Sequence, residues 1–280
     1  MSRIEEAIKK VASQKKSPIE KSAELVKQKR PITRHGKMAL DGRDIRTASP
    51  VVLLKSSHLM LPTAREEKTA IVEAYDKLRS TIIALTKGEN FLNTLMVTST
   101  TSEEGKTMTA LNLAVSLAKE HNYTALLVDC DLRRPSVYKY LDIPSAPKVG
   151  LIHCLRDNLP IEKALIKAGN GNLMILPAGG AVSDPVDMIS SNRMQEIVRE
   201  LKQRYPDRYI IFDSPPALPF ADAGILAGIV DSILFVVREG MAKSEDIEKT
   251  LDDLKEHNFL GIVYNDAHRF LKSQRYHYYY

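Results

Sequence analysis

From residue 93 onward, short apolar runs alternate with segments of helical periodicity. The runs are rich in Val, Ile, Leu and Phe, which is typical of strands buried on both faces. Strand–helix alternation of this kind predicts an α/β fold, with a doubly wound and mostly parallel sheet. Such sheets bind ligands at the carboxyl ends of their strands. We expect strands at 94–98, 125–129, 173–177, 209–213, 232–237 and 261–265, and helices at 66–87, 106–120, 192–204, 220–229 and 243–256.

The first predicted strand runs into a phosphate-binding loop. Gly105, Lys106 and Thr107 complete the second half of the P-loop pattern, Gly-x4-Gly-Lys-Ser/Thr, whereas Thr100 replaces its first Gly. A turn between a strand and a helix N-terminus presents backbone N–H groups to phosphates. In a P-loop the lysine reaches the β- and γ-phosphates and the Thr hydroxyl binds Mg²⁺. The predicted nucleotide contacts are Thr101, Ser102, Glu103, Glu104, Gly105, Lys106, Thr107 and Met108.

Acidic residues follow two more of the predicted strands. Asp129 and Asp131 lie on one side of the second strand end, with Arg133 after them. Two carboxylates and an arginine suit a metal-phosphate site, but this motif alone equally describes an ordinary polar loop. Asp213 ends the fourth strand at the Walker B position, which holds Mg²⁺, usually through water. With a P-loop in the same sheet, the metal interpretation of Asp213 is favoured.

The positive charge of the chain is concentrated at its start. Residues 1–65 hold 15 Lys and Arg against 6 Asp and Glu, and they contain no Phe, Trp or Tyr. Such an arm could lie on an anionic membrane or an acidic partner, or be a solvated, partly disordered leader. Without stacking aromatics, nucleic-acid binding is not expected. Within the arm we expect short helices at 2–13 and 18–29, followed by a linker.

Features that bear on the cellular compartment are sparse. The chain has no apolar run of the roughly 18 residues that a membrane span needs, and its first residues lack a secretory h-region. It has two cysteines, Cys130 and Cys154, which we expect to be small buried hydrophobic groups. These features predict a protein of the reducing cytoplasm.

The P-loop, the Asp-x-Asp-x-Arg-x-Pro strand end and the Asp-Ser-Pro-Pro strand end together resemble the bacterial tyrosine kinases, or BY-kinases, of the MinD/ParA-like P-loop branch. The resemblance covers residues 66–280 and includes 176–179, 191–194 and 261–265. The related ParA/MinD ATPases carry a signature lysine five residues before the P-loop lysine. Here that position is Thr101, so the sequence looks like the kinases.

The resemblance implies roles for the site residues of a protein-tyrosine kinase that uses ATP and Mg²⁺. Lys106 would bind the phosphates. Asp131 and Asp213 would complete the Mg²⁺ shell begun by Thr107, and Asp129 would accept or orient the tyrosine proton. The division of labour between Asp129 and Asp131 could be the reverse. Arg133 would contact phosphate or fix the aspartate pair, and Asn265 would lie near adenine.

Four tyrosines crowd the end of the chain and are similar to the autophosphorylation cluster of the family: Tyr276, Tyr278, Tyr279 and Tyr280. Residues 267–280 could extend about 48 Å, enough to reach their own site or a neighbour's. The bland alternative is an aromatic tail that docks on an apolar groove. We therefore expect three parts: a basic arm and linker at 1–65, a kinase domain at 66–266 and an acceptor tail at 267–280.

The resemblance also implies partners. A helix with Glu73 and Arg79 is similar to the one that the family uses for self-assembly into a ring, but Asp76 replaces its middle arginine. The opening residues look like the cytoplasmic autokinases of exopolysaccharide loci associated with exosortase/PEP-CTERM systems, whose transmembrane polysaccharide co-polymerase activator is a separate protein that would recruit the kinase to the inner membrane face. Alternatives are a ParA/MinD-like ATPase switch and an adaptor that binds ATP without chemistry.

Overall fold

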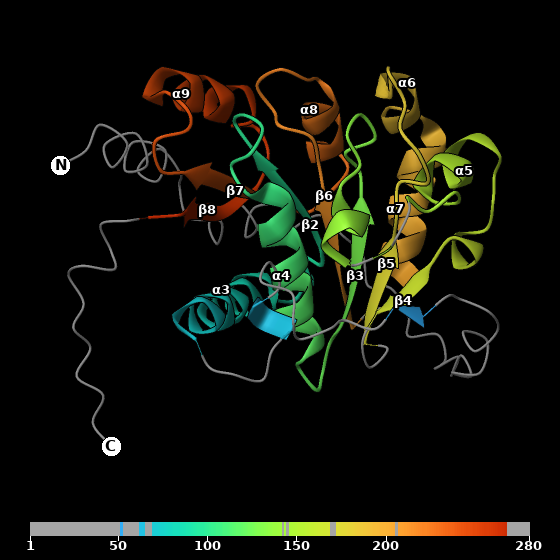
Figure 1. Ribbon diagram of the computed structural model, residues 1–280, viewed down its shortest axis with the longest axis horizontal. Helices are drawn as coiled ribbons and strands as arrows, with labels where there is room; N and C mark the ends of the chain where they lie inside the picture. Colours follow the sequence, from blue (N-terminus) through green and yellow to red (C-terminus); the bar gives the residue numbers. More distant parts are fainter. Residues whose placement is uncertain are drawn as a thin grey trace, which may run out of the picture. The chain divides into compact units, whose positions relative to one another are not determined.

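The computed structural model describes residues 51–52, 62–64, 69–141, 143, 146–168, 172–204 and 207–267. The helices expected at 2–13 and 18–29 and the tyrosine tail lie outside these residues. The described part forms one eight-stranded sheet in the order β1-β4-β5-β3-β6-β2-β7-β8 (Figure 1). Every neighbouring pair runs parallel except β4 and β5, which are antiparallel. The predicted doubly wound, mostly parallel sheet is confirmed.

The six expected strands are all present, within two residues of their predicted limits. The strands are β1 (Val51–Val52), β2 (Thr94–Ser99), β3 (Thr124–Asp129), β4 (Ile166–Ala168), β5 (Leu173–Leu176), β6 (Arg208–Asp213), β7 (Ser232–Arg238) and β8 (Phe259–Asn265). The α-helices are α3 (Ala70–Thr86), α4 (Lys106–Ala118), α5 (Leu151–Arg156), α6 (Val186–Ile189), α7 (Asn192–Arg204), α8 (Asp222–Ala227) and α9 (Ser244–Asp253). Short 3-10 turns lie at Pro62–Ala64, Val137–Leu141 and Ile161–Lys163. The sequence analysis did not predict β1, β4, α5 or α6.

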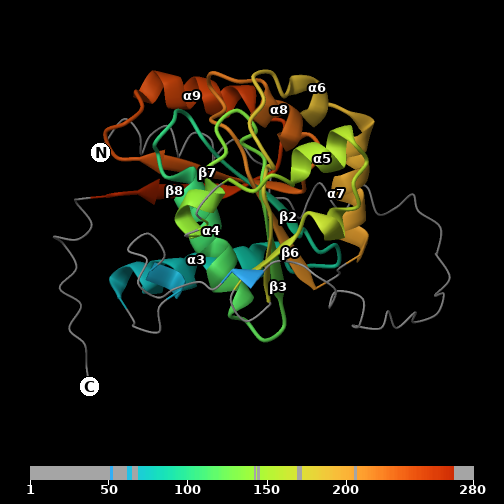
Figure 2. The ribbon, with the colours of Figure 1, turned by 45° about the vertical axis from the view of Figure 1, so that its right-hand side comes forward.

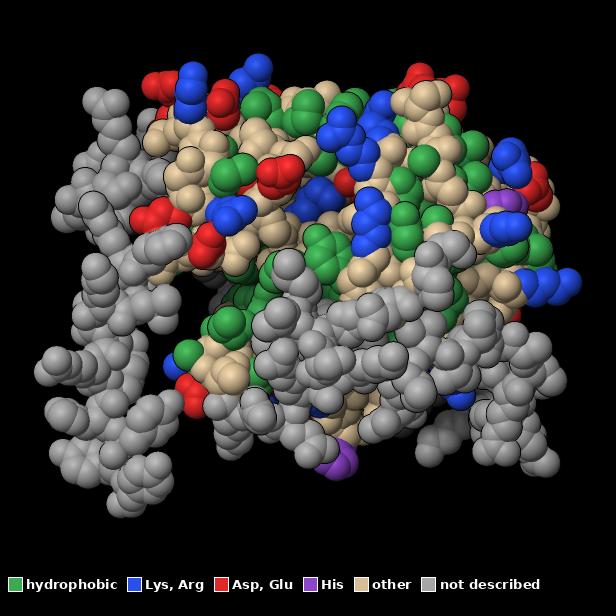
Figure 3. Space-filling model, viewed as in Figure 1, with side chains coloured by type: hydrophobic (Ala, Val, Ile, Leu, Met, Phe, Trp, Pro, Cys, Tyr) green, Lys and Arg blue, Asp and Glu red, His purple; other side chains and the backbone are tan. Residues whose placement is uncertain are grey.

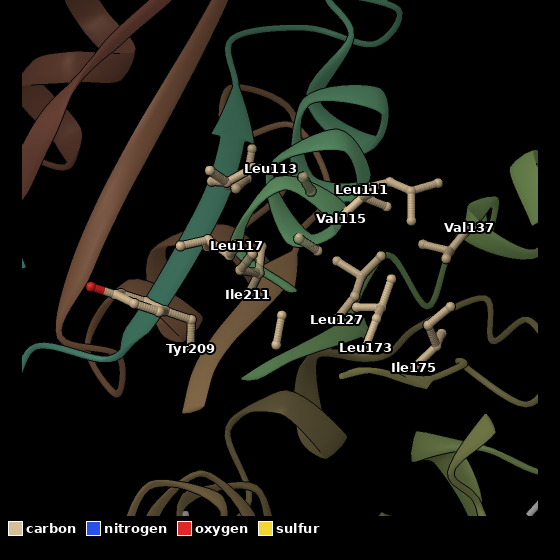
Figure 4. Packing of buried hydrophobic residues seen from close by; sticks show 14 of the residues in the cluster. Leu111, Leu113, Val115, Leu117, Leu127, Val137, Leu173, Ile175, Tyr209 and Ile211 are labelled. Carbon is tan, nitrogen blue, oxygen red and sulfur yellow. The ribbon is translucent and has the colours of Figure 1, made fainter. Parts of the chain in front are cut away.

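Helix α4, which follows the P-loop, is the central helix of one face of the sheet. All but two of its residues are buried, because it lies between the sheet and α3. Leu113 and Leu117 pack with Leu127 and Ile211 of the sheet (Figure 4). A helix that is apolar nearly all round needs cover on several sides. This burial fixes the helix N-terminus, and with it the P-loop, against the strand ends.

Helix α3 buries only some of the apolar residues that lie along it. Ile71, Ala74 and Leu85 are exposed. The buried positions are Val72, Ile82 and Thr86. The helix carries apolar residues on two neighbouring stripes, and packing on α4 selects the one that also lets Arg79 contact Ser116, 37 residues away.

The sheet is covered on both faces, as the turned view shows (Figure 2). Side chains of a strand alternate between faces, so residues such as Met96 and Phe212 point away from the α4 side. There α7 contacts β6 and α8 contacts β2. Within the described ranges, no helix has the length and apolar character that a membrane span requires.

Candidate active site

The P-loop leaves β2 at the carboxyl edge of the sheet. Glu103 and Gly105 both have left-handed backbone, with φ of 66° and 91°. A Cβ at Gly105 would also lie 2.2 Å from Nδ2 of Asn265, so a side chain there would displace that amide. Lys106 begins α4, so the N–H groups of its first turn remain available to an anion. The expected strand–turn–helix context of the P-loop is therefore present.

Lys106 lies between two aspartates. Its Nζ is 2.9 Å from Oδ2 of Asp131 and 3.7 Å from Oδ1 of Asp213. Burial by itself would lower the pKa of this lysine, but the charges of Asp213 and Asp131 outweigh burial and raise it. The lysine is therefore a fixed cation at the strand ends, where a phosphate would meet it.

Asp129 and Asp213 are partners in register at the ends of β3 and β6. Both are buried, and burial raises the pKa of each. The neighbouring charge of Asp213 raises the pKa of Asp129 further, whereas the charge of Lys106 opposes the rise at Asp213. The structure thus brings together Lys106, Asp129, Asp131 and Asp213, as the sequence analysis predicted.

The residues present fit a Mg²⁺ ion. Neither carboxylate oxygen of Asp213 has a hydrogen-bond partner among the described residues. Thr107, another predicted ligand, is buried next to Lys106, and its Oγ1 lies 3.4 Å from Nζ of that lysine. In the described ranges, no three His, Cys, Asp or Glu side chains cluster to hold a metal by themselves. Mg²⁺ uses one or two protein carboxylates together with phosphates and water, and Asp131 and Asp213 are the candidate carboxylates.

A cavity of about 130 Å³ opens beside Asp129. Its other walls are mainly apolar or small, among them Tyr138, Pro147 and Gly179. Oδ2 of Asp129 accepts hydrogen bonds from backbone N–H groups of the turn at 136–137, while Oδ1 is buried without a partner among the described residues. The site therefore combines an apolar cavity with one free carboxylate oxygen.

Comparisons with known proteins give the family of the chain. A family model described as an AAA domain matches residues 95–258. The chain is 32% identical to the tyrosine-protein kinase YwqD of Bacillus subtilis over 216 residues, which are 76% of this chain and 88% of that protein. This chain belongs to the bacterial tyrosine-protein kinase family. The kinase domain of the Escherichia coli tyrosine kinase ETK superposes on it with a TM-score of 0.61 at 26% identity, over 75% of this chain and 80% of that one.

The fold extends beyond the kinase family. The cell division ATPase MinD of Pyrococcus furiosus superposes with a TM-score of 0.53 at 26% identity, over 64% of this chain and 73% of that one. This likeness confirms the MinD-like fold that the sequence predicted. Thr101 stands where the ParA/MinD ATPases carry their signature lysine. Its backbone N–H donates to the Glu104 carboxylate at 2.6 Å.

Arg133 pairs with a carboxylate outside the aspartate pair that it follows. Its guanidinium forms a two-point ion pair with Asp222 of α8, at 2.7 and 3.2 Å. It also donates to the carbonyl of Ser183 and lies 4.6 Å from the centre of the Phe220 ring. Its hydrogen bonds favour a carboxylate partner 89 residues away over Asp129 and Asp131, and contact with phosphate stays a prediction.

Asn265 lies at the P-loop, but its side chain is used within the protein. Its Nδ2 donates to the carbonyl of Glu104 at 2.9 Å. This contact places Asn265 beside the P-loop. Its contact with adenine stays a prediction. Sequence reasoning missed Asp222, Ser136 and the cavity wall, since no local motif marks them.

Both cysteines are buried, as expected. Cys130 lies between the two aspartates in sequence, and burial together with the charge of Asp129 raises the pKa of its thiol well above the usual value. Burial raises the pKa of Cys154 to about 11. Neither thiol is a candidate for nucleophilic or metal chemistry, which needs the thiolate.

Proposed function

We propose that this chain transfers the γ-phosphoryl group of Mg-ATP to tyrosines at its own C-terminus. The observation that carries the proposal is the free Oδ1 of Asp129 beside an apolar cavity, at the same strand ends as Lys106. A phenol has an apolar ring and one O–H donor, and both properties match this cavity. The acceptors are Tyr276, Tyr278, Tyr279 and Tyr280.

The chain's own residues would divide the work of the transfer. Lys106 and the P-loop N–H groups bind the β- and γ-phosphates and hold them for attack. Asp129 accepts the phenol proton as the tyrosine oxygen bonds to the γ-phosphorus and the bond from that phosphorus to ADP breaks. The raised pKa of Asp129 makes its carboxylate a better base than an exposed aspartate.

Thr107, Asp131 and Asp213 would hold Mg²⁺. When bound, the ion neutralises charge on the phosphate oxygens. Asp131 is held next to Lys106, so the lysine and the metal would share its carboxylate. Thr101, Ser102, Glu103, Glu104 and Met108 complete the proposed nucleotide contacts.

The place of the kinase in the cell is part of the same proposal. We propose a cytoplasmic enzyme, made of an arm at 1–65, a kinase domain at 66–266 and a tail at 267–280, that a separate transmembrane polysaccharide co-polymerase recruits and activates. Phosphorylation of the tail would add about −1.5 to −2 charges at each site and so repel neighbouring subunits of a homo-oligomer. Through this cycle the kinase would regulate exopolysaccharide synthesis or export.

A homo-oligomer that used helix α3 would have to replace contacts that this helix makes within the chain. Asp76 accepts hydrogen bonds from Arg79 and from Ser116, at 2.8 and 3.0 Å. Arg79 also pairs with Glu120 of the segment after α4. Both helix residues are therefore engaged within this chain, and an assembly would have to compete with these contacts.

The test is an anti-phosphotyrosine blot of the full chain incubated with Mg-ATP and its activator. We expect signal from the wild type, none from Lys106→Met, and loss of most signal when all four tail tyrosines are changed to Phe. Arg156→Gln, an exposed change on α5, is the matched control and should label like the wild type. A wild type that hydrolyses ATP but gains no phosphotyrosine would instead favour the ATPase switch.

A further inference from the structure

The P-loop is fastened by side chains from the ends of two neighbouring strands. Nη1 of Arg238, the last residue of β7, donates to the carbonyl of Glu103 at 3.3 Å. Nδ2 of Asn265, the last residue of β8, donates to the carbonyl of Glu104 at 2.9 Å. Arg238 and Asn265 are partners in register, so the two contacts come from one side of the loop.

The same arginine also holds the residue that follows β8. Nε and Nη2 of Arg238 lie 3.1 and 2.8 Å from Oδ2 of Asp266. Asp266 has left-handed backbone, with φ of 54°, and its N–H donates to Oδ1 of Asn265 at 3.0 Å. The ion pair with Asp266 therefore orients Arg238 toward the P-loop. It also fixes the residue at which the chain leaves β8.

The P-loop needs such support because its turn is unfavourable. Glu103 has φ of 66°, a left-handed conformation that residues with a Cβ rarely adopt. Such conformations persist only where surrounding contacts impose them. The carbonyl of Glu103 is the acceptor for Arg238, so this contact acts on the strained residue itself.

We propose that Arg238 and Asp266 are positioning residues that hold the P-loop in its nucleotide-binding conformation. Asp266 acts through Arg238, and Arg238 acts through the Glu103 carbonyl. The pair thereby couples nucleotide binding to the point at which the C-terminal segment leaves the sheet. This inference rests on nucleotide binding by the P-loop, and phosphoryl transfer to tyrosine is not needed for it.

The Arg238–Asp266 pair is exposed, so its loss should affect nucleotide binding more than the stability of the fold. The Arg238 and Asp266 side chains are 39% and 46% exposed. Exposed ion pairs contribute little to global stability and are screened by salt. Loss of the pair should therefore weaken nucleotide binding and leave the melting temperature almost unchanged.

The experiment measures the Kd of Mg-ADP for the full chain by titration calorimetry, at low and high salt. The variants are Arg238→Gln, Asp266→Asn and the double variant, and Asn tolerates the left-handed backbone at 266. At low salt we expect Kd to rise about fivefold, about threefold and about fivefold respectively, in the range of coupling found for contacting residues. The Asp266→Asn effect should shrink at high salt, which a general loss of structure would not produce.

Arg156→Gln is the matched control, since Arg156 forms an exposed ion pair with Asp157 and neither residue contacts the P-loop in the described part of the chain. It should leave Kd unchanged. An unchanged Kd in Arg238→Gln would overturn the proposal, and so would a double variant whose loss equals the product of the two single losses. Normal coupling in a chain that makes no phosphotyrosine would count against the proposed function alone.

Discussion

Lys106 and Asp131 form a buried ion pair, with 2.9 Å between Nζ and Oδ2. A nucleotide phosphate must therefore share the lysine with a carboxylate, or displace it. When Mg²⁺ and nucleotide bind, Lys106 is expected to contact phosphate and Asp131 to contact the metal. Changing the aspartate separates these roles.

Asp131→Asn should free Lys106 while removing a magnesium ligand. We expect ADP in EDTA to bind as tightly as to the wild type, or more tightly, because one carboxylate no longer competes for the lysine. The tightening of ADP binding on adding Mg²⁺ should fall at least about tenfold, since magnesium sites depend on carboxylates. Calorimetric titration with and without Mg²⁺ measures both. Asp252→Asn, on exposed α9, is the control, and an unchanged magnesium effect in Asp131→Asn would contradict the assignment.

Asp129→Asn should separate chemistry from binding. Loss of a general base lowers rates by about 10²- to 10⁴-fold, so phosphotyrosine formation should fall by that range. The amide oxygen can still accept from the N–H groups of the turn at 136–137, so the fold and the Kd of Mg-ADP should change little. A time course of phosphotyrosine signal beside a nucleotide titration measures the two effects. Full labelling by Asp129→Asn would remove Asp129 from the mechanism.

Arg133→Gln should chiefly affect stability. The Asp222 side chain is only 2% exposed, and removing its partner leaves a buried charge unpaired. Because Arg133 is itself partly exposed, we expect a loss of about 2 to 3 kcal/mol in the free energy of unfolding, somewhat below the range for fully buried pairs. The double variant Arg133→Gln/Asp222→Asn should recover part of that loss. Urea denaturation measures this, and a large fall in Mg-ADP affinity without destabilisation would restore the phosphate role.

Glu103→Gly should relieve a strained turn. A left-handed residue with a Cβ costs about 1–2 kcal/mol, and the extra freedom of Gly in the unfolded chain offsets about half of that gain. We expect a net stabilisation of up to about 1 kcal/mol, measured by urea denaturation. Glu103→Gln removes the carboxylate but keeps the Cβ, so it should not stabilise the fold. If both variants stabilise equally, repulsion by the carboxylate is the cause and backbone strain is not.

Tyr209 should make stability fall at alkaline pH. Burial raises the pKa of Tyr209 to about 12, although the hydrogen bond with Thr86 opposes the rise. A raised pKa favours the neutral phenol in the folded state, so this contribution is complete below about pH 10 and is lost as the pH rises toward 12. Between pH 9 and pH 11 we expect a loss on the order of 1 kcal/mol from this residue. Tyr209→Phe should show a shallower decline in urea denaturation over that interval, and an identical decline would contradict the prediction.

The main strands could be predicted because each has an apolar run, and β2, β5 and β6 are buried along their whole length. Strand β8 lies at the edge of the sheet and is only half-buried, but its apolar run still marked it. The short strands β1 and β4 could not, since two or three residues carry no periodicity, and β4 contains Lys167. The side of α3 that is buried was also beyond the sequence. Its apolar residues form two neighbouring stripes, and only the surface of α4 decides between them.

The site was predictable where its residues end a strand or lie in the loop motif that follows one. Lys106, Asp129 and Asp213 meet because the carboxyl ends of β2, β3 and β6 are neighbours in the sheet. Charged side chains of both signs gather over the loops at that edge (Figure 3), and charge alone does not say which pair with which. The partner of Arg133 is on α8, so its identity depended on packing between distant parts of the chain.

The burial of both cysteines makes the protein ready for selective labelling. Maleimide and similar reagents attack exposed thiolates, whereas Cys130 and Cys154 are enclosed and held protonated. A cysteine introduced at an exposed position, such as Met241, would therefore take up a fluorophore while both native thiols stay in place. Cys130, between Asp129 and Asp131, need not be altered. A fluorophore at position 241 could therefore report nucleotide binding in a kinase that keeps both native cysteines.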